Sequence, residues 1–111
     1  MVSVIEALLK DITEKIVAAV HPRMIILFGS HARGTARPDS DFDFIVVEDG
    51  PFGPERSRRA RTVKLWRLLR DVRVAKDFLV FTPEEMEKWR DAPNHVVAHA
   101  LREGRVMYES H

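Results

Sequence analysis

The sequence predicts an α+β domain in which helices and strands alternate, with helices packed against a small mixed β-sheet. Two observations predict this class. Some segments carry apolar residues at helical spacing, and others are short apolar runs between turn residues. The segments follow the order helix, strand, short helix, strand, helix, strand, helix, helix, strand, and such alternation is typical of a sheet covered by helices.

The first half of the chain contains two of the predicted strands. Residues 2–20 carry apolar side chains at helical spacing, and this helix should end before Pro22 because the residue preceding a proline avoids helical backbone. Residues 24–28 form an apolar strand, and residues 31–40 predict a short helical turn followed by a loop. Residues 42–48 are apolar on both faces, which is typical of a central strand.

A third strand, residues 77–81, follows a predicted helix over residues 54–71. A connection through a helix favours a right-handed crossover between parallel strands. The apolar positions of this helix are expected to form one buried stripe: Val63, Leu65, Trp66, Leu68, Leu69 and Val72.

The last third of the chain predicts two helices and an edge strand. Thr82 followed by Pro83 and Glu85 forms a capping box, so a helix should begin there. A second helix is expected over residues 94–103, with Gly104 in the left-handed conformation at its end. Residues 105–109 are the candidate edge strand.

Length and composition exclude several classes of protein. The chain has 111 residues, 45% of them apolar, so we expect one domain, residues 1–111, that buries roughly 65% of its unfolded surface. Cysteine is absent, which excludes disulfide scaffolds, thiol catalysis and cysteine zinc sites. The apolar runs are far shorter than the ~18 residues of a membrane span, and the start lacks the basic region of a signal peptide. We therefore expect a cytoplasmic protein that does not enter a membrane.

The charges are segregated along the chain although the net charge is only +1. The stretch 38–49 contains five acids and no base: Asp39, Asp41, Asp43, Glu48 and Asp49. The stretch 56–70 contains seven bases and no acid: Arg56, Arg58, Arg59, Arg61, Lys64, Arg67 and Arg70. This pattern predicts a cation-binding patch beside an anion-binding one, which suits metal ions and phosphates.

The most informative motif joins Gly29-Ser30 to Asp41 and Asp43 across ten intervening residues. A glycine at a strand-to-helix junction lets a phosphate approach the backbone, and the serine adds a hydroxyl. Asp41 and Asp43 are two apart on a strand, so both carboxylates project from one face and repel each other. A hard cation such as Mg²⁺ would relieve that repulsion. Each half of the motif alone is also typical of ordinary strand ends.

The combined motif resembles the signature of the polymerase-β-type nucleotidyltransferase superfamily. The stretch from Leu27 to Asp43 is similar to that of its smallest members, the minimal nucleotidyltransferases (MNT), whose best-known role is as antitoxin to a HEPN-domain ribonuclease. The runs 77–85 and 100–109 are also similar to that family. The resemblance spans nearly the whole chain and implies a nucleotidyltransferase fold.

The resemblance implies a role for each matching residue. Gly29 and Ser30 would hold the triphosphate of a nucleotide. The three catalytic and metal-binding carboxylates would be Asp41, Asp43 and Asp77, which together would hold two Mg²⁺ ions during catalysis. Asp77 would also help to take the proton from the attacking hydroxyl, and Asp71 is the alternative third acid. Arg33 is expected to pair with the acids or to reach the phosphates.

The reaction implied by the resemblance is transfer of a nucleoside monophosphate to a hydroxyl acceptor with release of pyrophosphate. ATP is the implied donor, and a tyrosine of a HEPN toxin is the implied acceptor. Such a short chain is expected to need a partner, or a second copy of itself, to complete the pocket. Two alternatives stay open: an antitoxin that acts by occlusion alone, and transfer to a small hydroxylated molecule such as an aminoglycoside.

Other polar residues carry weaker indications. Ser40 is expected to cap its loop, and His31, next to Ser30, could approach a phosphate. His95 and His99 have a spacing that would allow metal chelation, but helix packing or solvent exposure is the expected role. The arginine-rich helix is a solvated face, a partner-docking surface or a surface that steers a substrate. Its few aromatic residues argue against direct nucleic-acid binding.

Overall fold

The computed structural model describes residues 3–37 and 39–110. Its elements follow in the predicted order: α1 (Val4–Val20), β1 (Met24–Phe28), α2 (Ser30–Arg33), β2 (Phe42–Val47), α3 (Arg58–Leu68), β3 (Lys76–Phe81), α4 (Pro83–Trp89), α5 (Val96–Glu103) and β4 (Arg105–Glu109). Val2 of the first predicted helix and Pro38 of the predicted loop lie outside the described residues. The predicted α+β class is confirmed.

The sheet is mixed, with the strand order β3-β2-β1-β4. β1 is antiparallel to both β2 and β4, whereas β2 and β3 are parallel, as predicted for two strands joined through a helix. β4 lies at one edge, as predicted. The register pairs Asp43 of β2 with Phe28 of β1 on one side and with Asp77 of β3 on the other.

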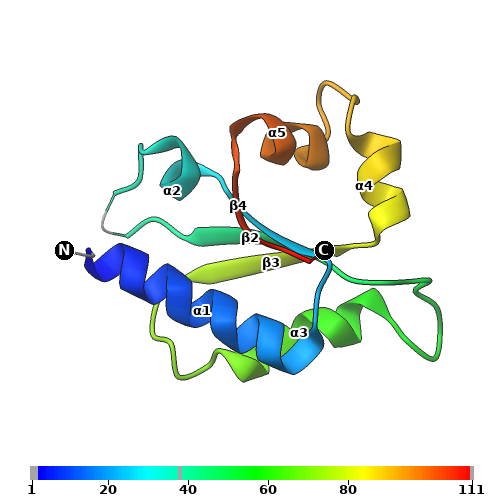
Figure 1. The fold of residues 1–111 in the computed structure, drawn as a ribbon, viewed down its shortest axis with the longest axis horizontal. Coiled ribbons are helices and arrows are strands. Elements are labelled where there is room, and N and C mark those ends of the chain that lie inside the picture. The colour runs from blue at the N-terminus through cyan, green and yellow to red at the C-terminus, as the bar shows by residue number, and fades with distance from the viewer. Residues whose placement is uncertain (1–2, 38, 111) are drawn as a thin grey trace.

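Helices cover both faces of this sheet (Figure 1). α1 and α3 pack on one face against Ile25, Leu27, Phe44, Val46, Phe78 and Val80. α4 and α5 pack on the other face against Ile26, Ile45 and Val47. β2 is therefore buried on both faces, as its sequence predicts. Of the described helices, none combines the length and the apolar character needed to cross a bilayer.

The helix ends explain why two predicted boundaries were wrong. The helix predicted over residues 54–71 is shorter, because Gly53 and Arg56 form an isolated β-bridge and Ser57 then caps α3 by accepting a hydrogen bond from Ala60 N at 3.0 Å. The helix expected from residue 94 begins at Val96, because His95 caps it. The capping box at Thr82 is confirmed.

The prediction of a left-handed Gly104 was wrong. Its φ of −81° and ψ of 173° are extended, so the chain runs from α5 directly into β4. A Cβ at this position would lie 2.3 Å from Ala100 O and 2.9 Å from Leu27 O, both of which are backbone atoms. The glycine is thus needed for close packing of the turn on β1 rather than for its backbone angle.

The placement of Trp66 in the core was also wrong. Trp66 is 40% exposed and Val63 is 37% exposed, whereas Leu65 and Leu69 are fully buried. Successive residues of a helix are rotated by about 100°, so Trp66 and Val63 lie roughly 60° and 120° from Leu69 around the helix, at the margin of the face that Leu65 and Leu69 bury. Trp66 instead packs edge-on against Phe78, with ring centroids 5.7 Å apart.

Candidate active site

Two of the predicted carboxylates lie side by side where two parallel strands begin. Asp43 of β2 and Asp77 of β3 are register partners, and Asp41 precedes Asp43 by two residues. Side chains alternate along a strand, so Asp43 shares its face with Ile45, on the side of the sheet that α4 and α5 cover further along. The fold therefore brings the three predicted acids to one end of one face.

Asp43 is the most perturbed of these acids. Its partial burial raises its pKa, and the negative charges of Asp77 and Asp41 raise it further. His31 and Arg33 act in the opposite direction and lower the pKa by smaller amounts. The carboxyl of Asp43 is thus held in a negative environment that a bound cation would favour.

Asp77 is exposed, and a hydrogen bond holds one of its two carboxylate oxygens. Its Oδ1 accepts a hydrogen bond from Phe78 N at 2.9 Å. The neighbouring Lys76 does not neutralise it, because its buried Nζ donates to Val72 O at 2.8 Å and Val74 O at 3.3 Å. Those bonds tie the turn after α3 to the first residue of β3. Lys76 therefore positions Asp77 without pairing with it.

Gly29 brings backbone against the carboxyl of Asp43. It precedes α2 with a φ of +76° and a ψ of −157°, a conformation that side-chain-bearing residues avoid. A Cβ on Gly29 would lie 2.6 Å from Asp43 Oδ2. Ser30, partly buried, follows as the first residue of α2. Gly29 and the carboxyl of Asp43 are thus in close contact, with Ser30 next in the chain.

His31 braces the loop that carries Asp41. Its ring stacks on Phe42 with centroids 3.7 Å apart and an interplanar angle of 9°, and its Nε2 lies 3.1 Å from Ser40 O. Ser40 Oγ accepts a hydrogen bond from Arg37 N at 2.8 Å, so the prediction that Ser40 caps the loop is confirmed. The sequence analysis missed this stacking role. The aromatic Phe42 between the two aspartates is the signal that could have indicated it.

Arg33 lies between the acids and α5. It is close enough to lower the pKa of Asp43, and its Nη1 is 3.9 Å from Glu103 Oε2 across an exposed gap. The expectation that Arg33 stays near the acids agrees with this placement. Exposed pairs at such a distance contribute little stability, so its side chain is free to reorient toward a phosphate.

The remaining candidates lie elsewhere. Asp71 follows α3, on the other side of the sheet from Asp43. His95 Nδ1 accepts a hydrogen bond from Val97 N at 3.1 Å, and its ring stacks on Trp89 with centroids 4.5 Å apart. His99 Nδ1 contacts Arg102 Nη2 at 2.9 Å. Both histidines therefore have the structural roles that were expected of them.

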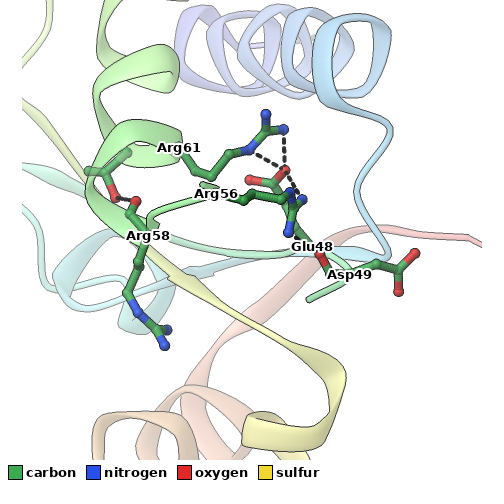
Figure 2. Close-up of polar contacts among 6 residues, drawn as sticks. Glu48, Asp49, Arg56, Arg58 and Arg61 are labelled. Atoms are coloured by element: carbon green, nitrogen blue, oxygen red, sulfur yellow. Dashed lines mark hydrogen bonds and ion pairs between the residues drawn. The ribbon is translucent and has the colours of Figure 1, made fainter. Parts of the chain in front are cut away.

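Part of each charge run is paired within the fold rather than left exposed. Glu48, at the end of β2, is only 2% exposed, and its Oε1 accepts a hydrogen bond from Arg61 Nε at 3.0 Å and lies 3.7 Å from Arg56 Nη2 (Figure 2). Arg58 pairs with Glu85 at 2.7 Å. Part of the basic run thus neutralises buried or half-buried acids within the fold, a role that the sequence analysis missed.

Comparison with known proteins agrees with this geometry. A family model described as "Nucleotidyltransferase domain" matches residues 6–103. No curated protein matches the chain significantly in sequence. Among solved structures, a Sulfolobus solfataricus protein provisionally assigned as a nucleotidyltransferase has a TM-score of 0.64 and 21% identity, over 93% of this chain and 78% of that one.

Two further structures are toxin–antitoxin complexes. One contains AMP-PNP and matches with a TM-score of 0.55 and 20% identity, over 91% of this chain and 73% of the other. A mutant of the MntA–HpeT pair matches with a TM-score of 0.62 and 18% identity, over 90% and 71%. At these identities the likeness establishes the fold. Because the family model spans nearly the whole chain, this protein belongs to the nucleotidyltransferase domain family.

Proposed function

We propose that this chain transfers a nucleoside monophosphate from a nucleoside triphosphate to a hydroxyl group, with release of pyrophosphate. The observation that carries the proposal is the pairing of Asp43 with Asp77 in adjacent parallel strands, with Asp41 two residues away and Gly29 against Asp43. Nucleotidyltransferase domains generally use divalent metal ions. The donor set, three carboxylates from two strands and a loop, fits a hard cation such as Mg²⁺.

The electrostatic environment of Asp43 supports the proposed metal site. Burial and the negative charges of Asp77 and Asp41 raise the pKa of Asp43, which means that its ionised form has too little positive charge nearby. We assign Asp41, Asp43 and Asp77 as the residues that would hold two Mg²⁺ ions. When bound, such ions polarise the α-phosphate and stabilise the leaving pyrophosphate.

The chain's own residues would position the triphosphate and remove the proton of the acceptor hydroxyl. Gly29 lets the triphosphate approach the backbone closely, and Ser30 offers a hydroxyl to it. The Oδ1 atom of Asp77 accepts a hydrogen bond from Phe78 N, and the second oxygen of Asp77 would take the proton from the acceptor hydroxyl. Arg33 is the candidate cation for the phosphates.

We further propose that the donor is ATP and that the acceptor belongs to a partner protein. Two of the similar solved structures are toxin–antitoxin complexes, and one of these contains AMP-PNP. The family resemblance supplies the finer hypothesis that the acceptor is a tyrosine of a HEPN-domain toxin. The chain would then be an antitoxin that modifies its toxin.

One observation favours a second candidate, an antitoxin that acts by occlusion. Within residues 3–37 and 39–110, no three acidic or histidine side chains are grouped as a metal-ligand set. Exposed Asp41 and Asp77 would need to turn toward Asp43 to form one. If they do not turn, the chain would bind its partner without modifying it.

Labelled ATP distinguishes the two candidates. The full chain is incubated with ATP labelled in the α-phosphate, Mg²⁺ and its co-purified partner. We expect label on the partner with the wild type and none with the Asp41→Asn/Asp43→Asn double variant. Neutralisation of the partner should fail with the same variant. Unlabelled partner that both proteins neutralise equally would establish occlusion.

A second pair of variants tests the choice of the third carboxylate. Asp77→Asn should abolish label transfer, because Asp77 is the register partner of Asp43. Asp71→Asn should leave transfer unchanged, because Asp71 lies after α3 on the other side of the sheet. The reverse result would assign the role to Asp71. Circular dichroism of both variants checks that each is folded.

A further inference from the structure

The structure divides the seven bases of residues 56–70 into two sets. Arg56, Arg58 and Arg61 pair with Glu48 or Glu85 inside the fold. The other four are exposed and form no ion pair with any described residue: Arg59, Lys64, Arg67 and Arg70. The first set is structural, so only the second set is available to a partner.

The available bases line a groove along α3 with a volume of about 830 Å³. Three of them lie on two neighbouring rows of the helix, one through Arg59, Val63 and Arg67 and one through Ala60, Lys64 and Leu68, and Arg70 follows the end of α3. Each row therefore alternates cationic and apolar side chains. Asp71 is the sole acid in the described lining, at one end of the groove.

The floor of the groove is apolar and open. Val63 is 37% exposed, and Ala60 and Leu68 contribute further apolar surface. Long basic side chains around small apolar ones form a surface that binds apolar groups at the centre and carboxylates at the margin. An anion without an apolar face would use only part of this surface.

We propose that this groove docks an acidic amphipathic helix of a partner protein. Apolar side chains of such a helix would cover Val63 and Leu68, and its carboxylates would pair with Lys64, Arg67 and Arg70. The four free positive charges against one acid provide the charge complementarity. Bidentate arginine–carboxylate pairs would fix the register of the docked helix.

Single-stranded nucleic acid fits this groove less well. Such ligands need exposed aromatic faces on which bases can stack. The nearby Trp66 has Lys76 Nζ 5.6 Å from its ring centroid, and it meets Phe78 edge-on. Its ring is thus already engaged with the protein. The apolar floor also offers nothing to a phosphate backbone.

The groove is separate from the candidate active site. α3 lies on the face of the sheet shared with α1 (Figure 1), whereas the alternation of side chains along β2 and β3 places Asp43 and Asp77 on the opposite face. Docking would therefore leave Asp43 open to nucleotide. The inference goes beyond the proposed transfer reaction and does not depend on it, and variants can separate the two.

A designed peptide tests the docking groove. The probe is a fluorescent helical peptide of about 18 residues, or five turns, with leucines on one face and glutamates on the other. We expect it to bind the full chain and Arg67→Glu/Arg70→Glu to weaken binding by more than about tenfold. Val63→Asp should also weaken it, because it places an acid in the apolar floor. The Arg102→Glu variant on α5 should bind as the wild type does, and so should Asp43→Asn.

Three results would overturn the proposal. The first is no binding of the peptide to the folded wild type. The second is equal binding of a peptide with the same composition in scrambled order, which would mean that the amphipathic face is not recognised. The third is tighter binding of a single-stranded RNA of similar charge that the Arg67/Arg70 variant loses, which would make the groove a nucleic-acid surface. Circular dichroism confirms that each variant is folded.

Discussion

The acidic side chains at the two ends of β2 have opposite electrostatic surroundings. At its end, Glu48 is 2% exposed and lies against Arg61 and Arg56 (Figure 2). At its start, Asp43 faces Asp77 and Asp41, and the pKa of Asp43 is raised. The end of β2 thus has arginines that neutralise its acid, whereas the start of β2 has several negative charges close together.

The comparison assigns a structural role to the acid at the end of β2 and a functional role to the acid at its start. A buried carboxylate that is matched by arginines is expected to matter for stability. A cluster of carboxylates with too little positive charge nearby costs stability, and such clusters occur where a ligand supplies the missing charge. The comparison therefore predicts that mutations at the start of β2 change activity and mutations at its end change stability.

The largest expected effect is on activity, at Asp43. Asp43→Asn should reduce nucleotidyl transfer by more than about 100-fold, because loss of groups that merely orient a metal ligand already costs 10–100-fold. Pyrophosphate release with ATP and the acceptor measures this loss. Glu48→Gln provides the matched control, since its folded fraction should keep the wild-type rate.

The next effect is on stability, at Glu48. Glu48→Gln should lower the free energy of unfolding by about 2–3 kcal/mol, since it leaves Arg61 without its carboxylate. The Arg61 side chain is 21% exposed, which places the cost at the low end for a broken buried pair. Urea unfolding followed by circular dichroism measures it.

A double substitution checks that the cost comes from the unpaired charge. Glu48→Leu combined with Arg61→Leu should destabilise the protein less than Glu48→Gln does, because the less exposed arginine is removed together with its carboxylate and Arg56, which is 38% exposed, can turn to solvent. A double variant that is less stable than Glu48→Gln would mean that the ion pair itself stabilises the protein, and that the cost of Glu48→Gln does not come only from the unpaired arginine.

Gly29→Ala should destabilise the protein by about 2 kcal/mol, from its strained backbone and from the contact with Asp43. Gly34→Ala is the comparison, because Gly34 has the same φ of +76° but a left-handed ψ of 17° and no atom within 4 Å of its Cβ position. Gly29→Ala should cost more, because its ψ of −157° adds backbone strain to the crowding at Asp43. Equal costs would show that neither the ψ of Gly29 nor Asp43 opposes a Cβ there.

The sequence predicts the site better than it predicts the charges around it. Gly29 and Asp43 could be predicted from a short motif, and Asp77 from the family resemblance, and the structure pairs Asp43 with Asp77. The family-implied roles of these residues stay predictions. The order of all nine elements was also predictable, since turn residues and apolar periodicity are local signals.

The pairing of charges was not predictable, because it depends on contacts far apart in the chain. Glu48 and Arg61 are separated by 13 residues and belong to opposite charge runs. Trp66 was misplaced for a related reason, since the apolar positions of α3 cover too wide an arc for all of them to be buried, and only packing determines which ones are. Local patterns thus predict elements, whereas neutralisation and burial require the assembled sheet.

The smallest expected effect is the pH dependence of stability, which has opposite signs at two carboxylates. Burial, Asp77 and Asp41 raise the pKa of Asp43, so ionisation of Asp43 costs stability as the pH rises through that pKa. The hydrogen bond from Arg58 lowers the pKa of Glu85, so Glu85 contributes stability at pH values above the ordinary carboxyl range, and this stability is lost in acid.

In metal-free buffer at pH 7, the Asp43→Asn variant should therefore melt at a higher temperature than the wild type, and the Glu85→Gln variant at a lower one. The Asp43 difference should shrink as the pH falls from the raised pKa of the folded state to the ordinary aspartate range. The Glu85 difference should shrink only at lower pH, as the pH falls from the ordinary glutamate range through the lowered pKa of the folded state. An Asp43→Asn protein that melts with the wild type at pH 7 would mean that the start of β2 carries no uncompensated charge, and the contrast between its two ends would fail.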